Sequence, residues 1–475
     1  MRKILILCSV IIFNSNVFSQ EVPSQLSLQE AIDFALENNR TAINAARDIE
    51  AAEEQKWETT ATGLPQINAS IGYQNFLKQQ VQIVPNAAFD NRQATISTVE
   101  EFFDIQANGS PEPATGFSEI IFGTKQNVNA TATLSQLIFD GSYIVALQSA
   151  KVFLEISQNA KTKTDLQIRQ SVINAYGNVL LTEESIEILE KNIDVLEENL
   201  FETTKIYENG LEEEESVEQL QITLSGVKSN LNNTERLKDI AYQMLNIALG
   251  IDIYKDLTLT DNLETLTEKN RSLRLLEADN NPESTIDYQI AENDTETKAL
   301  MLKLEQSKAL PTIGGYLNGG YLGFSDEFTF LDNDQRWAGF SSFGFTMDIP
   351  IFSSGMRSAS TQRARINLEK AKTELSEIEQ RIKLQIEEAK SNYRFALEDY
   401  ENKKNNLALA ERIEQKNQTK YFEGIAGSFE LRQAQTQLYT AQQELLQAML
   451  DVINSKAELE TILNTPITKL NSQSK

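Results

Sequence analysis

Four short segments of the chain place apolar side chains at every second position. They lie at about residues 65–75, 126–137, 311–324 and 338–350. A period of two predicts strands with one apolar and one polar face. In the last segment, four apolar residues alternate with four small or polar ones: Phe343, Phe345, Met347 and Ile349 with Ser342, Gly344, Thr346 and Asp348.

Two much longer segments have helical spacing. Residues 142–207 and 356–421 contain no proline, and each would span about 99 Å as one continuous helix. Apolar residues recur along them with the heptad spacing that favours coiled-coil packing, and the turns "ENG" and "FEG" end them with a glycine. We therefore predict two helical hairpins, 142–250 with a tip near 207–216 and 356–463 with a tip near 421–430.

Three landmarks occur twice and in the same order. They are TGLPQINASIGY and KALPTIGGYLNGGY, QLIFDG and IPIFSSG, and YENGLEEEESVEQLQ and YFEGIAGSFELRQAQ. This recurrence predicts two tandem structural repeats, 20–250 and 281–465, with a connector at 251–280 and a tail at 466–475.

The start of each predicted repeat has a helical pattern. In the first repeat Ser27 and Glu30 form a capping box, and the pattern continues without a break to Leu64. The first repeat also contains a long loop, 75–125, that exceeds its counterpart in length.

The composition excludes several classes of function. The chain has 69 acidic and 43 basic residues, a net charge of −26, which argues against nucleic acid as a partner. Histidine is absent and the one cysteine is Cys8, so imidazole and thiolate catalysis and the usual zinc sites are excluded from the mature protein. We expect no enzyme activity, no cofactor and no metal site.

The N-terminal residues 1–19 have the pattern of a secretory signal peptide. Arg2 and Lys3 precede an apolar stretch, and a cut is expected after Ser19, which would remove Cys8. No later run of 18 apolar residues occurs. The sequence therefore predicts an exported protein without a membrane helix.

The predicted strands allow two interpretations. They could form a small soluble sheet, or they could belong to a membrane β-barrel with apolar residues outside and polar residues inside. Four strands cannot close a barrel and open edges are not tolerated in lipid, so the membrane interpretation requires several copies. The helices would then project across the periplasm. The alternative to a membrane pore is a periplasmic coiled-coil scaffold that tethers partners and forms no pore.

The predicted tips carry the candidate functional side chains. In a symmetric assembly Glu430 would form a ring of carboxylates that attracts cations. The run Glu212–Glu215 is either a solvated face or part of an acidic pore mouth. Tyr207 and Tyr421 each stand three residues before a tip glycine, where they either act in gating or pack the coiled coil.

In order and spacing these segments resemble the TolC-like outer membrane efflux protein family, the outer membrane factors, from Leu26 to about Asn464. LSLQEAIDFALENN is similar to the family's opening helix, although Arg40 follows where the family often has proline. LPQINASIGY and LPTIGGYLNGGY resemble its strand entries, and QLIFDG and PIFSSG its junctions from strand to long helix. YFEGIAGSFELRQAQTQLYTAQQEL resembles the second tip and its returning helix.

The resemblance implies a mixed α and β membrane protein. Three copies would each give four strands to one 12-stranded outer-membrane barrel, continued by a periplasmic barrel of coiled-coil helices, with the connector 251–280 in its equatorial region. The protein would be the passive exit duct of a tripartite efflux or type I secretion system. Its partners would be a periplasmic membrane fusion (adaptor) protein, an inner-membrane pump of the RND or ABC type, and outer-membrane lipid. The cargo stays open between drug, metal ion, siderophore and polypeptide.

The resemblance also assigns tip residues. The family's tip tyrosine corresponds to Tyr421 and its acidic constriction to Glu430. A second acidic position is Gln433 here, and the basic latch residue is Ala426, so the family's gating salt bridge is not reproduced. The docking tips for the adaptor correspond to Gly210-Leu211 and Gly424-Ile425, and the loop 75–125 would lie outside the cell.

Overall fold

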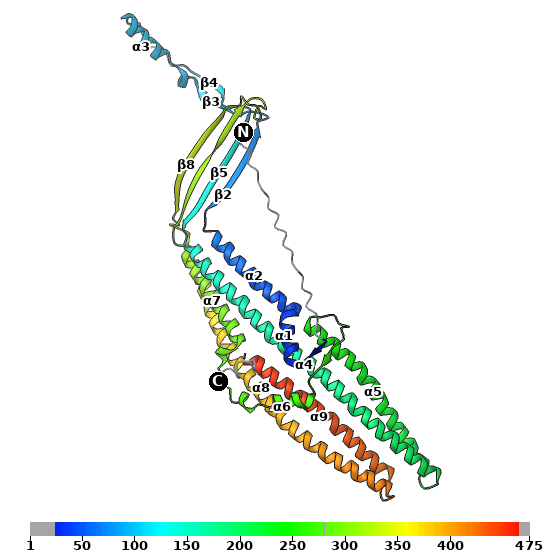
Figure 1. Cartoon of the computed structure of the whole chain (residues 1–475). Coiled ribbons are helices and arrows are strands. Elements are labelled where there is room, and N and C mark those ends of the chain that lie inside the picture. The colour runs from blue at the N-terminus through cyan, green and yellow to red at the C-terminus, as the bar shows by residue number, and fades with distance from the viewer. Residues whose placement is uncertain (1–23, 110, 279–280, 465–475) are drawn as a thin grey trace. The chain divides into compact units, whose positions relative to one another are not determined.

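The computed structural model describes residues 24–109, 111–278 and 281–464 (Figure 1). The predicted signal peptide, 1–19, and the whole predicted tail, 466–475, lie outside these residues. The described chain is mixed and mostly helical, and it forms two compact units. The first contains the described residues of 1–54, 150–299 and 365–475, and the second contains 55–149 and 300–364. Each predicted repeat contributes to both units, so the units differ from the predicted repeats.

The second unit is built on a four-stranded antiparallel sheet in the order β2-β5-β7-β8 (Figure 1). Each strand covers one of the four alternating segments of the sequence. Their bounds are β2 (Gln66–Asn75), β5 (Gln126–Phe139), β7 (Thr312–Ser325) and β8 (Trp337–Asp348). The edge strands β2 and β8 each pair on one side only.

Because the strands pair in register, the alternating side chains assemble into two continuous faces. One row crosses the sheet through Ile71, Ala130, Tyr321 and Gly339. Ile71 is 82% exposed on this face and Phe343 is 79% exposed. The apolar face of the sheet is therefore uncovered by the residues that the structure describes.

The segment between β2 and β5 differs from the expected loop, because it contains structure of its own. It forms a two-stranded antiparallel pair with a 3-10 turn and a helix between the strands: β3 (Val81–Pro85), η1 (Asn86–Phe89), α3 (Arg92–Phe103) and β4 (Phe117–Ile121). Asp90 organises this segment, since its carboxylate pairs with Arg92 at 2.7 Å and accepts the Ala114 N–H at 2.9 Å. These contacts hold the pKa of Asp90 below its usual range.

The remaining long elements are helices. They are α1 (Leu28–Asn38), α2 (Arg40–Ala61), α4 (Gly141–Glu208), α5 (Glu214–Leu249), α7 (Ile286–Ser307), α8 (Met356–Phe422) and α9 (Ser428–Ile462). Within the described residues, none of the helices is long and apolar enough to cross a membrane.

The first helical pattern is broken where one continuous helix was expected. The predicted capping box of Ser27 and Glu30 is present. However, Asn39 leaves the helix with ψ at 131°, and its side chain accepts the Thr41 N–H at 2.8 Å. The Asn39 amide also donates to the Ala248 carbonyl at 2.8 Å. This contact with a residue 209 positions away fixes a break that local sequence does not signal.

The predicted connector is an integrated part of the first unit. It contains β6 (Thr258–Leu259), α6 (Leu263–Asn270) and the 3-10 turn η2 (Leu273–Leu275), and a further turn, η3 (Pro282–Ser284), precedes α7. β6 pairs in parallel with β1 (Gln25–Leu26). The hydroxyl of Tyr176 lies 3.0 Å from the Leu26 carbonyl, and that of Tyr393 donates to the Asn270 carbonyl at 2.6 Å.

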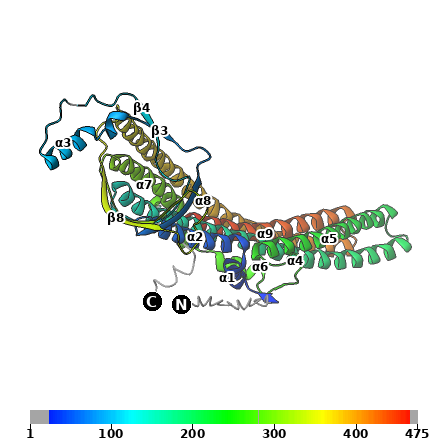
Figure 2. The same ribbon diagram turned by 90° about the horizontal axis from the view of Figure 1, so that it is seen from above.

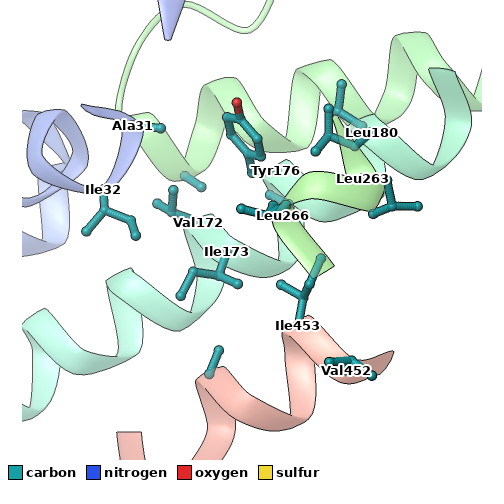
Figure 3. Packing of buried hydrophobic residues seen from close by; sticks show 14 of the residues in the cluster. Ala31, Ile32, Val172, Ile173, Tyr176, Leu180, Leu263, Leu266, Val452 and Ile453 are labelled. Carbon is teal, nitrogen blue, oxygen red and sulfur yellow. The ribbon is translucent and has the colours of Figure 1, made fainter. Parts of the chain in front are cut away.

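The core of the first unit is formed by α1, α4, α5, α6, α8 and α9, and Figure 3 shows residues of α1, α4, α6 and α9 within it. Tyr176 is completely buried there beside Val172 and Leu263. The contributing residues shown are Ala31 and Ile32 from α1, Ile173 and Leu180 from α4, Leu266 from α6, and Val452 and Ile453 from α9. Burial of this apolar surface gives the helical unit its own hydrophobic stabilisation.

Candidate functional site at the helical tips

The two tips of the first unit are built from the same turn. After α4, the Leu211 N–H donates to the Ile206 carbonyl and the Gly210 N–H to the Tyr207 carbonyl, at 3.1 and 2.8 Å. After α8, Ile425 and Gly424 make the same two bonds at 2.8 and 3.0 Å, to the carbonyls of Lys420 and Tyr421. This is the Schellman arrangement, and the glycines supply its left-handed residue, with φ of 79° and 68°.

Each turn presents one large apolar side chain to its surroundings. Leu211 is 79% exposed and Ile425 is 71% exposed. The hydroxyls of Ser216 and Ser428, at the starts of α5 and α9, lie 2.9 Å apart. The returning helices therefore begin next to each other, and α4, α5 and α9 run side by side (Figure 2).

The two candidate tyrosines have different surroundings. Tyr421 is 5% exposed, and its hydroxyl lies 2.9 Å from the hydroxyl of Thr203, which is completely buried on α4. Burial raises the pKa of Tyr421, and the bond to Thr203 opposes that rise. Tyr207 is 38% exposed. Of the two tyrosines, Tyr421 is therefore the one whose hydroxyl contacts the other hairpin.

Glu430 has a local structural role at the start of α9. Its carboxylate accepts the Gly427 N–H at 3.0 Å, which caps the helix while the side chain stays exposed. Gln433 lies one turn further on, in a groove between α8 and α9 that Phe429 and Arg432 also line. Ala426 lies in the turn that precedes α9 and offers no charge for a latch.

The glutamate run of the first tip serves the start of α5. Glu213 is the N-cap residue, and Glu214 and Glu215 lie in the first turn, where carboxylates interact favourably with the helix dipole. Glu212 accepts a hydrogen bond from the Ser216 hydroxyl at 2.6 Å. These contacts give the run a local role in starting the helix.

A row of polar side chains between α4 and α9 was not predicted from the sequence. Asn192 donates to Gln442 at 2.9 Å, and the Gln443 amide donates to Ser185 at 3.1 Å. Asn199 and Gln435 are each 1% exposed. Ser185, Asn192 and Asn199 are seven residues apart, which is the only signal in the sequence. Thr203, the partner of Tyr421, was missed because a heptad pattern counts only apolar residues.

No set of three or more carboxylate, histidine or cysteine side chains suited to a metal occurs in the part of the chain that the structure describes.

Comparison with known proteins gives one family and several similar folds. A sequence model of the family described as outer membrane efflux protein matches residues 31–251 and 301–465. Comparison with curated proteins finds no match.

Several solved structures are similar. CusC, whose structures concern folding and transmembrane channel formation, is 18% identical to this chain with a TM-score of 0.70. The match covers 93% of this chain and 92% of CusC. The outer membrane protein VceC of Vibrio cholerae is 16% identical, with a TM-score of 0.67. The match covers 92% of this chain and 96% of VceC. The outer membrane channel CmeC of Campylobacter jejuni is 15% identical, with a TM-score of 0.66. The match covers 94% of this chain and 88% of CmeC. The family resemblance drawn from the sequence is thereby confirmed.

Proposed function

Because this chain belongs to the outer membrane efflux protein family, we propose that it is the outer-membrane exit duct of a tripartite efflux or type I secretion system. Members of this family are channels rather than enzymes. In the proposed system an inner-membrane pump of the RND or ABC type delivers the substrate through a periplasmic adaptor. The substrate then diffuses passively through this protein to the outside.

The observation that carries the proposal is the uncovered apolar face of the sheet. A sheet with exposed Ile71 and Phe343 and two open edges, β2 and β8, is unsuited to water. Three copies joined edge to edge would close a 12-stranded barrel, with this face toward lipid and the polar face toward a pore. The segment 75–125 would then lie outside the cell.

The helical hairpins complete the duct. We place the adaptor on the exposed Leu211 and Ile425 side chains and their neighbours Gly210 and Gly424, because rigid turns that present apolar groups suit a docking partner. The two halves 20–250 and 281–465 would be tandem repeats that each supply two strands and one hairpin. A signal peptide at 1–19 would direct export.

The experiment tests whether Glu430 lines the pore. Glutamine can still accept the Gly427 N–H, so Glu430→Gln removes the charge and keeps the helix cap. In planar bilayers we expect the purified trimer to conduct ions, and the variant to lower its K⁺ over Cl⁻ permeability ratio about two-fold. Glu235→Gln, which removes an exposed carboxylate from α5, is the matched control. An unchanged permeability ratio for Glu430→Gln would reject Glu430 as a pore-lining residue. A protein that forms no channel would reject the proposed function as an exit duct.

A periplasmic coiled-coil scaffold is the second candidate, and the long paired hairpins favour it. The two functions differ in whether the sheet enters a membrane.

A further inference from the structure

The sheet is almost free of charge. Lys, Arg, Asp and Glu make up 24% of the chain. Across β2, β5, β7 and β8 the only such residue is Asp348, the last residue of β8. The acidic excess of the protein therefore lies outside this sheet.

Apart from Asp348, the polar face of the sheet consists of amides, hydroxyls, glycines and a few aromatic and aliphatic side chains. The register places Ser70, Thr131, Gly320 and Phe340 in one row across it. This face would line the pore in the barrel proposed above, and the inference that follows rests on that proposed function.

The polar side chains bond along the face instead of standing free. The hydroxyls of Ser70 and Thr131 are 2.8 Å apart, and the Thr133 hydroxyl donates to the Asn318 amide oxygen at 3.2 Å. Such lateral bonds satisfy the polar groups of neighbouring strands without a partner in the pore.

Two side chains also occupy the space beside glycines of the adjacent strand. A Cβ at Gly72 would be 2.3 Å from the Asn129 side-chain oxygen, and one at Gly344 would be 2.6 Å from the Tyr316 hydroxyl. The absent side chains of the glycines leave the space that Asn129 and Tyr316 fill. Apart from Asp348 at the end of β8, the face is therefore uncharged, and it is low in relief.

From these observations we infer that the sheet is a charge-neutral conduit. It passes cationic, anionic and neutral solutes alike, and any charge preference of the channel arises outside the sheet. Charged side chains lining a pore set its ion selectivity, and their influence in solution fades beyond about 10 Å at 0.1 M salt. A wall without them contacts the substrate through hydrogen bonds and ring surfaces only.

The experiment adds one charge at a time to the proposed wall. Apart from Cys8 in the predicted signal peptide the chain has no cysteine, so a single introduced thiol can be labelled cleanly. Ser341 and Ser342 are adjacent and exposed on β8, but they belong to opposite faces. Each is changed to cysteine and labelled with a methanethiosulfonate that carries a trimethylammonium, a sulfonate or a neutral hydroxyl group.

For Ser342→Cys we expect the two charged labels to shift the K⁺ over Cl⁻ permeability ratio about two-fold in opposite directions, while the neutral label leaves it unchanged. No label on Ser341→Cys changes the ratio. Asp348→Asn, which removes the only charge of the sheet, leaves the ratio of the unlabelled channel as it was.

Three outcomes overturn the proposal in distinguishable ways. If Asp348→Asn shifts the ratio as much as a charged label on Ser342→Cys, the sheet is not neutral. If complete labelling of Ser342→Cys, shown by mass spectrometry, leaves the permeability ratio of a conducting channel unchanged, the polar face does not line the pore. If no variant and no parent protein conducts, the proposed duct itself is wrong.

Discussion

At the scale of single residues, position in a motif does not determine surroundings. Tyr207 and Tyr421 occupy the same place in two identical turns. Tyr421 is buried against Thr203 on the neighbouring hairpin, whereas Tyr207 is 38% exposed. Tyr421 finds the buried hydroxyl of Thr203 on the opposite helix, α4. Spacing in the sequence finds both tyrosines but cannot rank them.

Buried charges illustrate the same dependence on neighbours. The Glu460 carboxylate is 2% exposed on α9, and its two oxygens lie 2.8 Å from the Arg169 guanidinium and 3.5 Å from the Lys456 ammonium. The Lys456 ammonium also donates to the Asn270 amide oxygen at 3.0 Å. Burial lowers the pKa of Lys456, and Glu460 opposes this shift. One carboxylate therefore balances two buried cations.

We predict that Glu460→Ala lowers the free energy of unfolding of the helical unit by about 3–5 kcal/mol, since it leaves both cations buried without a counter-charge. Denaturant unfolding followed by the helical circular dichroism signal measures the change. Glu458→Ala, an exposed position on the same helix, is the control and should change stability by less than about 0.5 kcal/mol. Equal losses in the two variants would show that Glu460 does not act through charge balance.

At the scale of elements, sequence reasoning succeeded where the deciding contacts repeat along the chain. The strands follow from alternation over ten or more residues, as at Phe343 and Phe345, and the long helices follow from heptads without proline. It failed where one distant contact decides. The break at Asn39 depends on the Ala248 carbonyl. β3 and β4 are only five residues each and pair with each other, and Asp90 accepts the Ala114 N–H in the segment between them.

The packing of α8 and α9 also creates a pH-dependent element. Burial raises the pKa of Glu414, on α8, above its ordinary 4.5, and an interaction with Gln435 opposes the rise. As the pH rises through this region, the unfolded chain ionises before the folded one. Stability is therefore greatest with Glu414 protonated, and it is lost as the pH rises from 4.5 through the folded-state pKa.

Glu414→Gln should remove this loss. We expect the variant to unfold at higher denaturant concentration than the parent at about pH 7 and at nearly the same concentration below about pH 4. Parallel urea titrations at the two pH values test this, with Glu411→Gln, an exposed residue of α8, as the control. A gain of the same size at both pH values would mean that glutamine improves packing rather than relieving a charge.

At the scale of the whole molecule, the two units differ in what stabilises them. The helical unit buries a continuous apolar core around Tyr176. The sheet exposes apolar side chains such as Phe343 and Phe345, which have no covering layer among the described residues. A membrane can supply that layer for the sheet, whereas the helices need only water and each other. Damage to the apolar face should therefore affect insertion and leave the helical core folded.

The double variant Phe343→Lys and Phe345→Lys tests this separation and also decides between duct and scaffold. A lysine on the lipid face of a barrel costs about 2–4 kcal/mol at the bilayer midplane, so two should abolish insertion. We expect the variant to disappear from outer-membrane fractions while its helical circular dichroism signal and cooperative unfolding persist. Ser342→Lys places a lysine directly before them in the strand but on the polar face, and this variant should still insert. If the double variant inserts like the parent, the sheet does not meet lipid, and the scaffold becomes the better description of the protein.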